Sequence, residues 1–407
     1  MPHATEGLAA RLDAHLRQHA AFGSKLSGSR GDAATADWIR EHLAHEGFSL
    51  QSQDIGIPVF SGRTTRLLAG DAGVALLPQL PAVPTDASGI RAPLAVIRHV
   101  FEASDAWGCI ALVVLPFARH ATIDSPAIGP LVKAVADAGA LAIGIVTTGP
   151  TGEAIGLNAA PDLPFVPVPT AIIAPSDAGP LLRAAHAGIS ATFVLDGEAD
   201  RGATVNIVAR RERGARWLAF STPRTGWFDC VGERGTGTAA FLELISWATR
   251  RYPDLSLFAL NSGAHEFLGA GTKEALPLAP PPADTLLWIH LGATLAARNV
   301  WELRGPDGLM PSADPQRMLM ASSGMLPVAI EAFAGLSGLE APIPIVPRAG
   351  ELSSIADHGY ANVFAVLGMH RFFHTRIDTY DKVDAHLLAP VVDAHRAMIE
   401  AAVADLV

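Results

Sequence analysis

The chain has 407 residues, of which 49% are hydrophobic and 17% are charged, and its formal net charge is −10. This length favours two or three domains, and this composition is typical of a folded globular protein and excludes a disordered one. With this negative net charge, neither a broad basic surface nor a nucleic-acid partner is expected. The only two cysteines, Cys109 and Cys230, exclude a disulfide framework and a cysteine zinc ribbon.

Residues 5–48 are predicted to form two amphipathic helices around a Gly/Ser turn, because leucines and other apolar residues recur there with helical spacing. Asp32 is expected to cap the start of the second helix, and Gly47 stands where a helix end favours glycine.

The amino-terminal residues lack the basic start and apolar core of a secretory signal. Gly, Pro or His interrupts every long apolar stretch well short of the roughly 20 residues that a membrane span needs. We therefore expect a cytoplasmic protein that does not associate with membranes.

Residues 56–204 are rich in Val, Ala, Gly and Pro and poor in charge. Within them, 107–116, 141–149 and 165–175 are predicted strands, and 125–140 and 176–188 are predicted helices. Two strand–helix–strand units in succession indicate a small, independent α/β module.

From residue 203 onward, predicted strands and helices alternate over a longer stretch. The expected strands are 204–211, 216–222, 255–262, 285–293, 343–347 and 362–369, and the expected helices are 238–252, the middle of 311–336, and 387–407. This alternation predicts an α/β fold with a mostly parallel central sheet flanked by helices on both faces. Ligands of such sheets bind beyond the carboxyl ends of the strands.

The loops that follow these strands carry a high density of polar and titratable side chains. These residues are Arg224, Asp229, Cys230, Glu233, His265, Glu266, His290, His370 and His374. Metal chemistry needs such groups to converge from several loops, and Glu233, Glu266 and His374 could supply one site. For any one of them alone, a surface position or a hydrogen bond to backbone is the more common role, and neither an HExxH nor a CxxC motif is present.

The segment KLSGSRGDAATADWIREHLAHEGF, with its SGS turn before a helix that ends in glycine, is similar to the leading segment of the zinc aminopeptidase and glutaminyl-cyclase superfamily. The run from Lys133 through VPVPTAIIAPSDAGPLL resembles an inserted protease-associated domain. This resemblance implies an aminopeptidase-like catalytic domain made of 1–55 and 205–407, and a protease-associated domain at 56–204.

The resemblance also implies that one metal position has been lost. Thr222 and Arg224 stand where the family has the His and Asp of its His-x-Asp motif. His290 and Gly292 stand at the Asn and the metal-binding Asp of a later strand end, and Glu351 stands at the Asp of a Ser-Asp-His segment. Neither threonine nor glycine offers a good metal ligand.

The other metal position keeps good ligands in Glu233, Glu266 and His374. The resemblance therefore implies one divalent metal; two carboxylates and a histidine suit zinc, with iron or manganese as alternatives. His265 stands where the family has its glutamate general base, unless the register slips by one and exchanges His265 with Glu266.

These positions lead to the hypothesis of a single-metal hydrolase that acts on an amide or peptide-like bond. His265 would transfer protons, and His290 would stabilise the oxyanion or bind the metal. Arg224 would bind a small carboxylated substrate, and Trp227 would line its pocket. The alternatives for these two residues are a salt bridge with Asp229 or Glu233 for Arg224, and core packing for Trp227.

Two other functions are alternatives to the single-metal hydrolase. Cys230 lies in the same loop as Glu233, and an imidazole could activate its thiol in a metal-free hydrolase. Alternatively, the chain is a catalytically inactive homologue that binds a ligand or partner at the former site. The substrate is expected to be a small molecule or a short peptide-like compound, and a homo-oligomer is open because the apolar module could bury a face against a partner.

Overall fold

The computed structural model describes residues 2–303 and 308–406, which divide into two compact units. Unit 1 contains residues up to 55, 203–373 and 377 onward; unit 2 contains 56–202 together with 374–376. The two units meet along the chain at 55/56 and at 202/203. The short segment 374–376 packs with unit 2 although it belongs to the late part of the chain.

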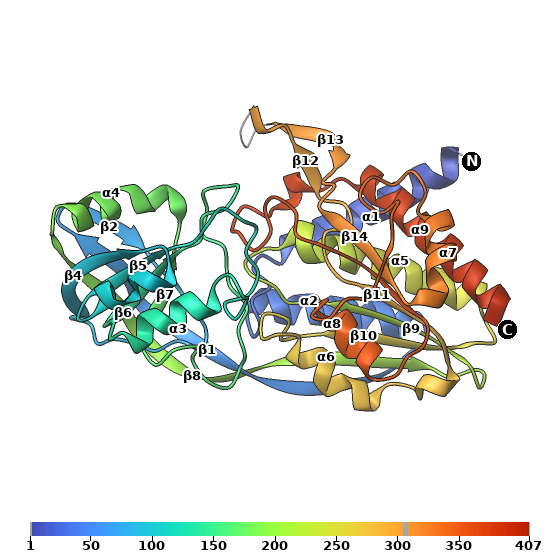
Figure 1. Ribbon diagram of the computed structural model, residues 1–407. Coiled ribbons are helices and arrows are strands. Elements are labelled where there is room, and N and C mark those ends of the chain that lie inside the picture. Colours follow the sequence, from blue (N-terminus) through green and yellow to red (C-terminus); the bar gives the residue numbers. More distant parts are fainter. Residues whose placement is uncertain (1, 304–307, 407) are drawn as a thin grey trace. The chain divides into compact units, whose positions relative to one another are not determined.

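Unit 1 contains most of the helices and a seven-strand portion of sheet (Figure 1). Its helices are α1 (Pro2–Ala21), α2 (Arg30–His45), α5 (Thr236–Arg251), α6 (Ala270–Ala275), α7 (Leu326–Ala332), α8 (Glu351–Asp357) and α9 (Ala385–Leu406). Its strands are β9 (Trp217–Pro223), β10 (Ser256–Ser262), β11 (Thr285–Leu291), β14 (Arg317–Ala321), β15 (Ile343–Pro344) and β16 (Val363–Gly368), and a separate hairpin joins β12 (Arg298–Val300) to β13 (Leu309–Ala313).

The order of strands in the unit 1 sheet is β15-β14-β16-β11-β9-β10-β8, where β8 is Ser190–Arg211. The central pairs β16–β11, β11–β9 and β9–β10 are parallel, whereas β14–β16 and β10–β8 are antiparallel. The predicted α/β fold with a mostly parallel sheet is therefore confirmed. Because β9, β10 and β11 are parallel, their carboxyl ends meet at one edge, and the loops that follow them lie together there.

Alternating side chains of each central strand enter two different cores. In β9, Leu218 and Phe220 pack in the core that holds α1, α5 and α9, whereas Ala219 packs on the other face, in the core that holds α8. All three side chains are fully buried. The uninterrupted apolar runs of the sequence therefore reflect a sheet that is covered on both faces.

One predicted helix is wrong in part. The middle of 311–336 contains the strand β14, which pairs antiparallel with β16 from Arg317 to Ala321, and only Leu326–Ala332 forms a helix. The five-residue run RMLMA is too short for periodicity to separate a strand from a helix, and pairing with the sheet edge decides the outcome.

At the start of α2, Ser29 is the capping residue, and its Oγ accepts a hydrogen bond from the backbone N–H of Asp32 at 3.1 Å. The prediction that Asp32 caps this helix is therefore wrong by one turn. Gly47 has a φ of +81°, which agrees with the predicted glycine at the helix end.

Unit 2 has its own α/β core. It contains β2 (Ala72–Ala75), β3 (Leu77–Pro78), β4 (Ile90–Ile97), β5 (Ile110–Val114), α3 (Gly129–Asp137), β6 (Ala142–Val146), β7 (Thr170–Ile173) and α4 (Pro175–His186). The strands β4, β5, β6 and β7 are parallel neighbours, and two apolar clusters pack on their faces. The long strands β1 (Ser49–Ala69) and β8 have residues in both units.

No helix in the described part of the chain combines the length and the hydrophobicity that crossing a membrane requires.

Candidate functional site

The loops at the carboxyl edge of the unit 1 sheet hold an unusual backbone. Phe228 and Cys230 after β9, Ala264 after β10 and Thr294 after β11 all have φ between +41° and +63°, although none is glycine. The turn Val231–Gly235 that follows Cys230 is π-helical. Left-handed non-glycine residues and π-helical turns concentrate at functional sites, which directs attention to this edge.

His265 and Glu351 form a hydrogen-bonded pair at this edge and are candidate catalytic residues. His265 lies in the loop after β10, and its Nδ1 is 2.8 Å from Oε1 of Glu351, the first residue of α8. The Glu351 side chain is fully buried, whereas 17% of the His265 side chain is exposed. Thr225 fixes the loop, because its Oγ1 accepts a hydrogen bond from the backbone N–H of His265 at 3.0 Å.

Glu351 is held as a carboxylate. Burial opposes its ionisation, but hydrogen bonds from His265 and Thr272, together with the positive charges that His265 and His290 carry when they are protonated at low pH, outweigh it, so that the pKa of Glu351 falls to about 2. Oγ1 of Thr272 donates to Oε2 at 2.6 Å, and Oγ of Ser262 lies 3.2 Å from the same oxygen. An ionised acceptor on Nδ1 selects the tautomer in which Nε2 of His265 carries the lone pair.

His290, at the end of β11, is buried beside this pair. Its Nδ1 is 2.8 Å from Oγ of Ser221, and that oxygen also accepts a hydrogen bond from Nε1 of Trp288 at 2.7 Å. Burial lowers the pKa of His290 to about 4, against the opposing charge of Glu351. His290 is therefore a neutral imidazole near pH 7, which can take part in hydrogen bonds but contributes no positive charge.

Glu266, a predicted metal ligand, instead binds the turn before α2. Its Oε1 accepts from the backbone N–H of Ser27 at 3.0 Å, and its Oε2 accepts from Oγ of Ser27 at 2.9 Å. Burial raises the pKa of Glu266, and the hydrogen bonds from Ser27 and Thr225 offset only part of that rise. The carboxyl group thus ties the loop after β10 to the SGS turn.

Glu233, the second predicted carboxylate ligand, forms an ion pair with its neighbour. Nη2 of Arg234 is 2.6 Å from Oε1 of Glu233, and both side chains are buried. Asp378 fixes the turn that carries them: its two carboxylate oxygens accept from the backbone N–H groups of Gly232 at 2.8 Å and Glu233 at 3.0 Å. His370 lies 3.3 Å from the same carboxylate.

The third predicted ligand, His374, belongs to unit 2, where its Nδ1 is 2.8 Å from the carbonyl oxygen of Gly156. Within either unit taken by itself, the described residues include no group of three or more His, Cys, Asp or Glu side chains that could hold a metal ion. Protein donors engage both oxygens of Glu266, and a guanidinium lies against Glu233. The two predicted carboxylate ligands of unit 1 therefore already bind protein donors, an arrangement that does not suit a divalent metal.

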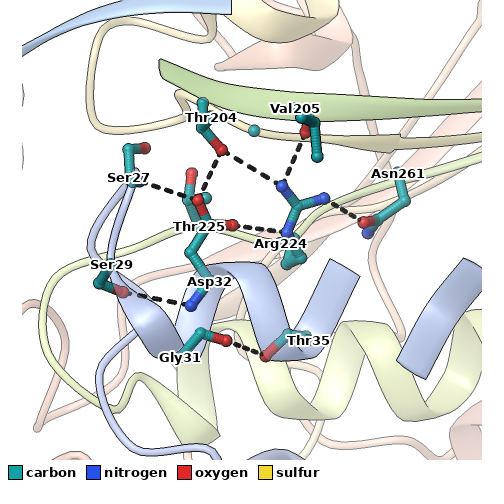
Figure 2. A network of polar contacts seen from close by, with 12 residues as sticks. Ser27, Ser29, Gly31, Asp32, Thr35, Thr204, Val205, Arg224, Thr225 and Asn261 are labelled. Atoms are coloured by element: carbon teal, nitrogen blue, oxygen red, sulfur yellow. Dashed lines mark hydrogen bonds and ion pairs between the residues drawn. The ribbon is translucent and has the colours of Figure 1, made fainter. Parts of the chain in front are cut away.

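Arg224 is bound on all sides by polar groups of the protein itself, which favours a structural role over substrate binding (Figure 2). Its side chain is fully buried, and Nε donates to Oδ1 of Asp32 at 2.6 Å. Nη1 donates to Asn261 at 2.6 Å, and Nη2 donates to the carbonyl of Val205 at 2.7 Å. The predicted alternative of a salt bridge was correct in kind, but the partner is Asp32 rather than Asp229 or Glu233.

The structure also assigns Trp227 and Cys230 to the protein interior. Trp227 is only 3% exposed and lies beside Phe228, which favours the core-packing alternative over a pocket wall. Cys230 is fully buried, and this burial raises the pKa of its thiol well above the usual range. Burial and the raised pKa both disfavour a thiolate, so the structure gives the Cys230 mechanism no support.

Three partners were missed in the sequence. The sequence gives Glu351 no specific role, predicts Asp32 as a helix cap and gives no role to Arg234. A signal for Arg234 is present: this arginine lies in a Gly-rich turn two residues before α5, and the first ten residues of that helix are buried. A charge in such a setting must be paired inside the protein. Asp32 gives no such signal, because its partner lies 192 residues away.

Comparison with protein-family models finds no match, and neither does comparison with curated proteins. Among solved structures, the chain is similar to a zinc aminopeptidase from Bacillus subtilis, with a TM-score of 0.75 at 16% identity over 97% of this chain and 94% of that one.

Two other solved structures are similar to the same degree. An aminopeptidase from Aneurinibacillus sp. strain AM-1 has a TM-score of 0.70 at 16% identity, over 98% of this chain and 95% of that one. A peptidase M28 precursor from Shewanella amazonensis SB2B has a TM-score of 0.71 at 16% identity, over 97% and 95%. At this identity the likeness establishes the aminopeptidase fold; the identification of residues 56–204 as a protease-associated domain stays a prediction.

Proposed function

We propose that this chain is a hydrolase of amide or peptide-like bonds in which His265, hydrogen-bonded to Glu351, transfers the protons. The observation that carries this proposal is the pairing of a partly exposed imidazole with a fully buried, ionised carboxylate at the carboxyl edge of the sheet. The aminopeptidase fold of the solved relatives supports a hydrolytic reaction by analogy alone.

His265 would act first as a base and then as an acid. Nε2, which has no hydrogen-bond partner among the described residues, would take a proton from water as the water oxygen adds to the carbonyl carbon. The imidazolium would then give that proton to the leaving nitrogen while the carbon–nitrogen bond breaks. Glu351 would hold the ring in the required tautomer and neutralise its transient charge.

The proposal differs from the single-metal mechanism predicted from the sequence. That mechanism needs Glu233 and Glu266 as ligands, and both carboxyl groups already bind protein donors. The carboxylated substrate also loses its support, because Arg224 is buried and paired. A small molecule or short peptide-like substrate, a cytoplasmic location and the lack of a nucleic-acid or membrane partner remain part of the proposal, and self-association stays open.

A catalytically inactive, ligand-binding homologue is the second candidate. The specific observation in its favour is that Glu233 and Glu266, the carboxylates predicted to bind a metal, already form a salt bridge and hydrogen bonds inside the protein. In this view the His265–Glu351 pair only fastens the loop after β10 to α8.

The test is hydrolysis of a panel of aminoacyl p-nitroanilides and p-nitrophenyl esters by chelator-treated protein. The dyad hydrolase predicts turnover that His265→Gln and Glu351→Gln each reduce about 100-fold or more, whereas exposed His45→Gln leaves it unchanged. Turnover that appears only after zinc is added back would overturn the dyad mechanism. Absence of turnover across the panel, with all variants equally folded, favours the binding homologue.

A further inference from the structure

Arg234 occupies a cage of oxygen atoms at the carboxyl edge of the sheet. Its Nη2 donates to Oε1 of Glu233 at 2.6 Å, Nε donates to the carbonyl oxygen of Thr225 at 3.0 Å, and Nη1 donates to that of Gly292 at 3.3 Å. These acceptors come from the loop after β9, the π-helical turn and the loop after β11. The side chain is only 1% exposed.

Two of the residues around this guanidinium stand at metal-ligand positions of the resemblance, Glu233 at the metal position that is kept and Gly292 at the one that is lost. Glu233 and Gly292, which stand at two ligand positions of the resemblance, both accept hydrogen bonds from Arg234. Thr222 stands at a third and lies close by: a Cβ built on Gly237 would be 3.2 Å from both Oγ1 of Thr222 and the carbonyl oxygen of Gly292. Residues at two ligand positions of the resemblance therefore bind a cation that belongs to the chain itself.

We infer that Arg234 is an internal cation that takes the place of a divalent metal ion and closes this site to metals. An arginine keeps its charge at physiological pH, and its planar group matches one carboxylate and several carbonyl oxygens at once. A divalent ion would have to displace a buried positive charge that already neutralises Glu233, and the desolvated guanidinium would then have no anion.

The turn that carries Arg234 is fixed independently of any ligand. The carboxylate of Asp378 binds the N–H groups of Gly232 and Glu233, and a Cβ added to Gly232 would lie only 2.7 Å from Oδ1 of Asp378. Glu233 is thus positioned toward Arg234 by contacts with the backbone, so the ion pair does not need a bound ion to form.

The inference is tested by metal content and thermal stability, neither of which depends on the proposed hydrolytic activity. Protein purified without chelator or immobilised nickel is loaded with Zn²⁺ or Mn²⁺, dialysed and analysed by plasma mass spectrometry. The wild type is expected to hold no stoichiometric metal. Arg234→Ala exposes Glu233 and two carbonyl oxygens, and is expected to melt at a lower temperature and to retain about one equivalent.

Guanidinium ion provides a second readout. Low concentrations should raise the melting temperature of Arg234→Ala by roughly a few degrees relative to the same concentration of sodium chloride, and should not raise that of the wild type. The double variant Arg234→Ala/Glu233→Ala should respond to neither guanidinium nor metal. Arg317→Ala is the matched control: that buried arginine donates to the carbonyls of Leu295 and Ser337, so its loss should create no metal site.

One equivalent of divalent metal in the wild type that Glu233→Ala abolishes would overturn the inference. It would also fail if Arg234→Ala were as stable as the wild type and responded to neither ion. If Arg234→Ala does not fold, the wild-type metal content still decides the question, and Arg234→Lys, which keeps the charge but not the planar fork, should fold with reduced stability and bind no metal.

Discussion

Several buried polar residues of unit 1 are paired within the protein, and the pairing gives them a role different from the one that the isolated residue suggests. Arg224 binds Asp32 and not a substrate, and Glu266 binds Ser27 and not a metal. The cost of removing one partner is large, since a charge left buried without its counter-ion loses both water and protein contacts.

Replacement of Arg224 by methionine should therefore destabilise the protein strongly. We expect a loss of about 3–5 kcal/mol in the free energy of unfolding in urea, because Asp32 would remain buried without its guanidinium partner. Arg11→Met is the matched control: Arg11 pairs with Glu243 but is 55% exposed, and should cost under about 1 kcal/mol. Equal losses for the two variants would contradict the structural role of Arg224.

His395 predicts a pH dependence of stability. The ring lies between Phe333 and Phe364, its Nδ1 contacts the carbonyl of Val391 at 2.7 Å, and burial lowers its pKa to about 4. Between that value and the unfolded value near 6.5, the unfolded chain binds more protons than the folded one. Stability from this residue is therefore complete above about pH 6.5 and falls as the pH drops toward 4, by at most about 1.4 kcal/mol per pH unit.

The variant His395→Phe keeps an aromatic ring in the cluster but cannot titrate. Its free energy of unfolding, measured in urea between pH 7 and pH 4.5, should decline less steeply than that of the wild type. His45→Gln, at an exposed position, should retain the wild-type slope. Identical slopes for all three proteins would show that His395 does not contribute to acid destabilisation.

Single elements owe their ends to local chemistry, and α2 is the clearest case. Ser29 caps its first turn through the N–H of Asp32 and also donates to the carbonyl of Ser24. Ser29→Ala should lower the free energy of unfolding by about 1 kcal/mol, and Ser29→Asp, which restores a capping oxygen, should recover most of that loss. If the aspartate variant is no more stable than the alanine variant, the cap is not the source of the effect.

Much of the element order could be predicted because apolar runs bounded by Gly and Pro mark the buried strands β9, β10, β11 and β16. The strand β14 could not, since its five residues acquire their structure only by pairing with β16. The candidate site also has a part that the sequence predicts and a part that only the fold determines. Residue types on strand-end loops are readable in the sequence, whereas the partner of each depends on contacts such as Arg224 to Asp32 and His265 to Glu351, which the fold alone creates.

At the scale of the whole molecule, each unit has its own apolar cores. Leu112 is fully buried in unit 2, and Leu242 is fully buried in unit 1. Leu112→Ala and Leu242→Ala should each cost about 2–5 kcal/mol, but each should lower the midpoint of a different calorimetric transition. A single transition shifted equally by both variants would mean that the two cores unfold together.

The order of the elements along the chain determines when, during translation, α1 can be buried. The helix α1 packs against α9, the last described element, and also against α5, while all of 56–202 belongs to unit 2. During translation, unit 2 can therefore fold while Leu8, Leu12 and Leu16 of α1 still lack the partners that bury them. Until the ribosome has delivered α9, the nascent chain carries an uncovered amphipathic helix, and this interval is when a chaperone that holds apolar segments would matter most.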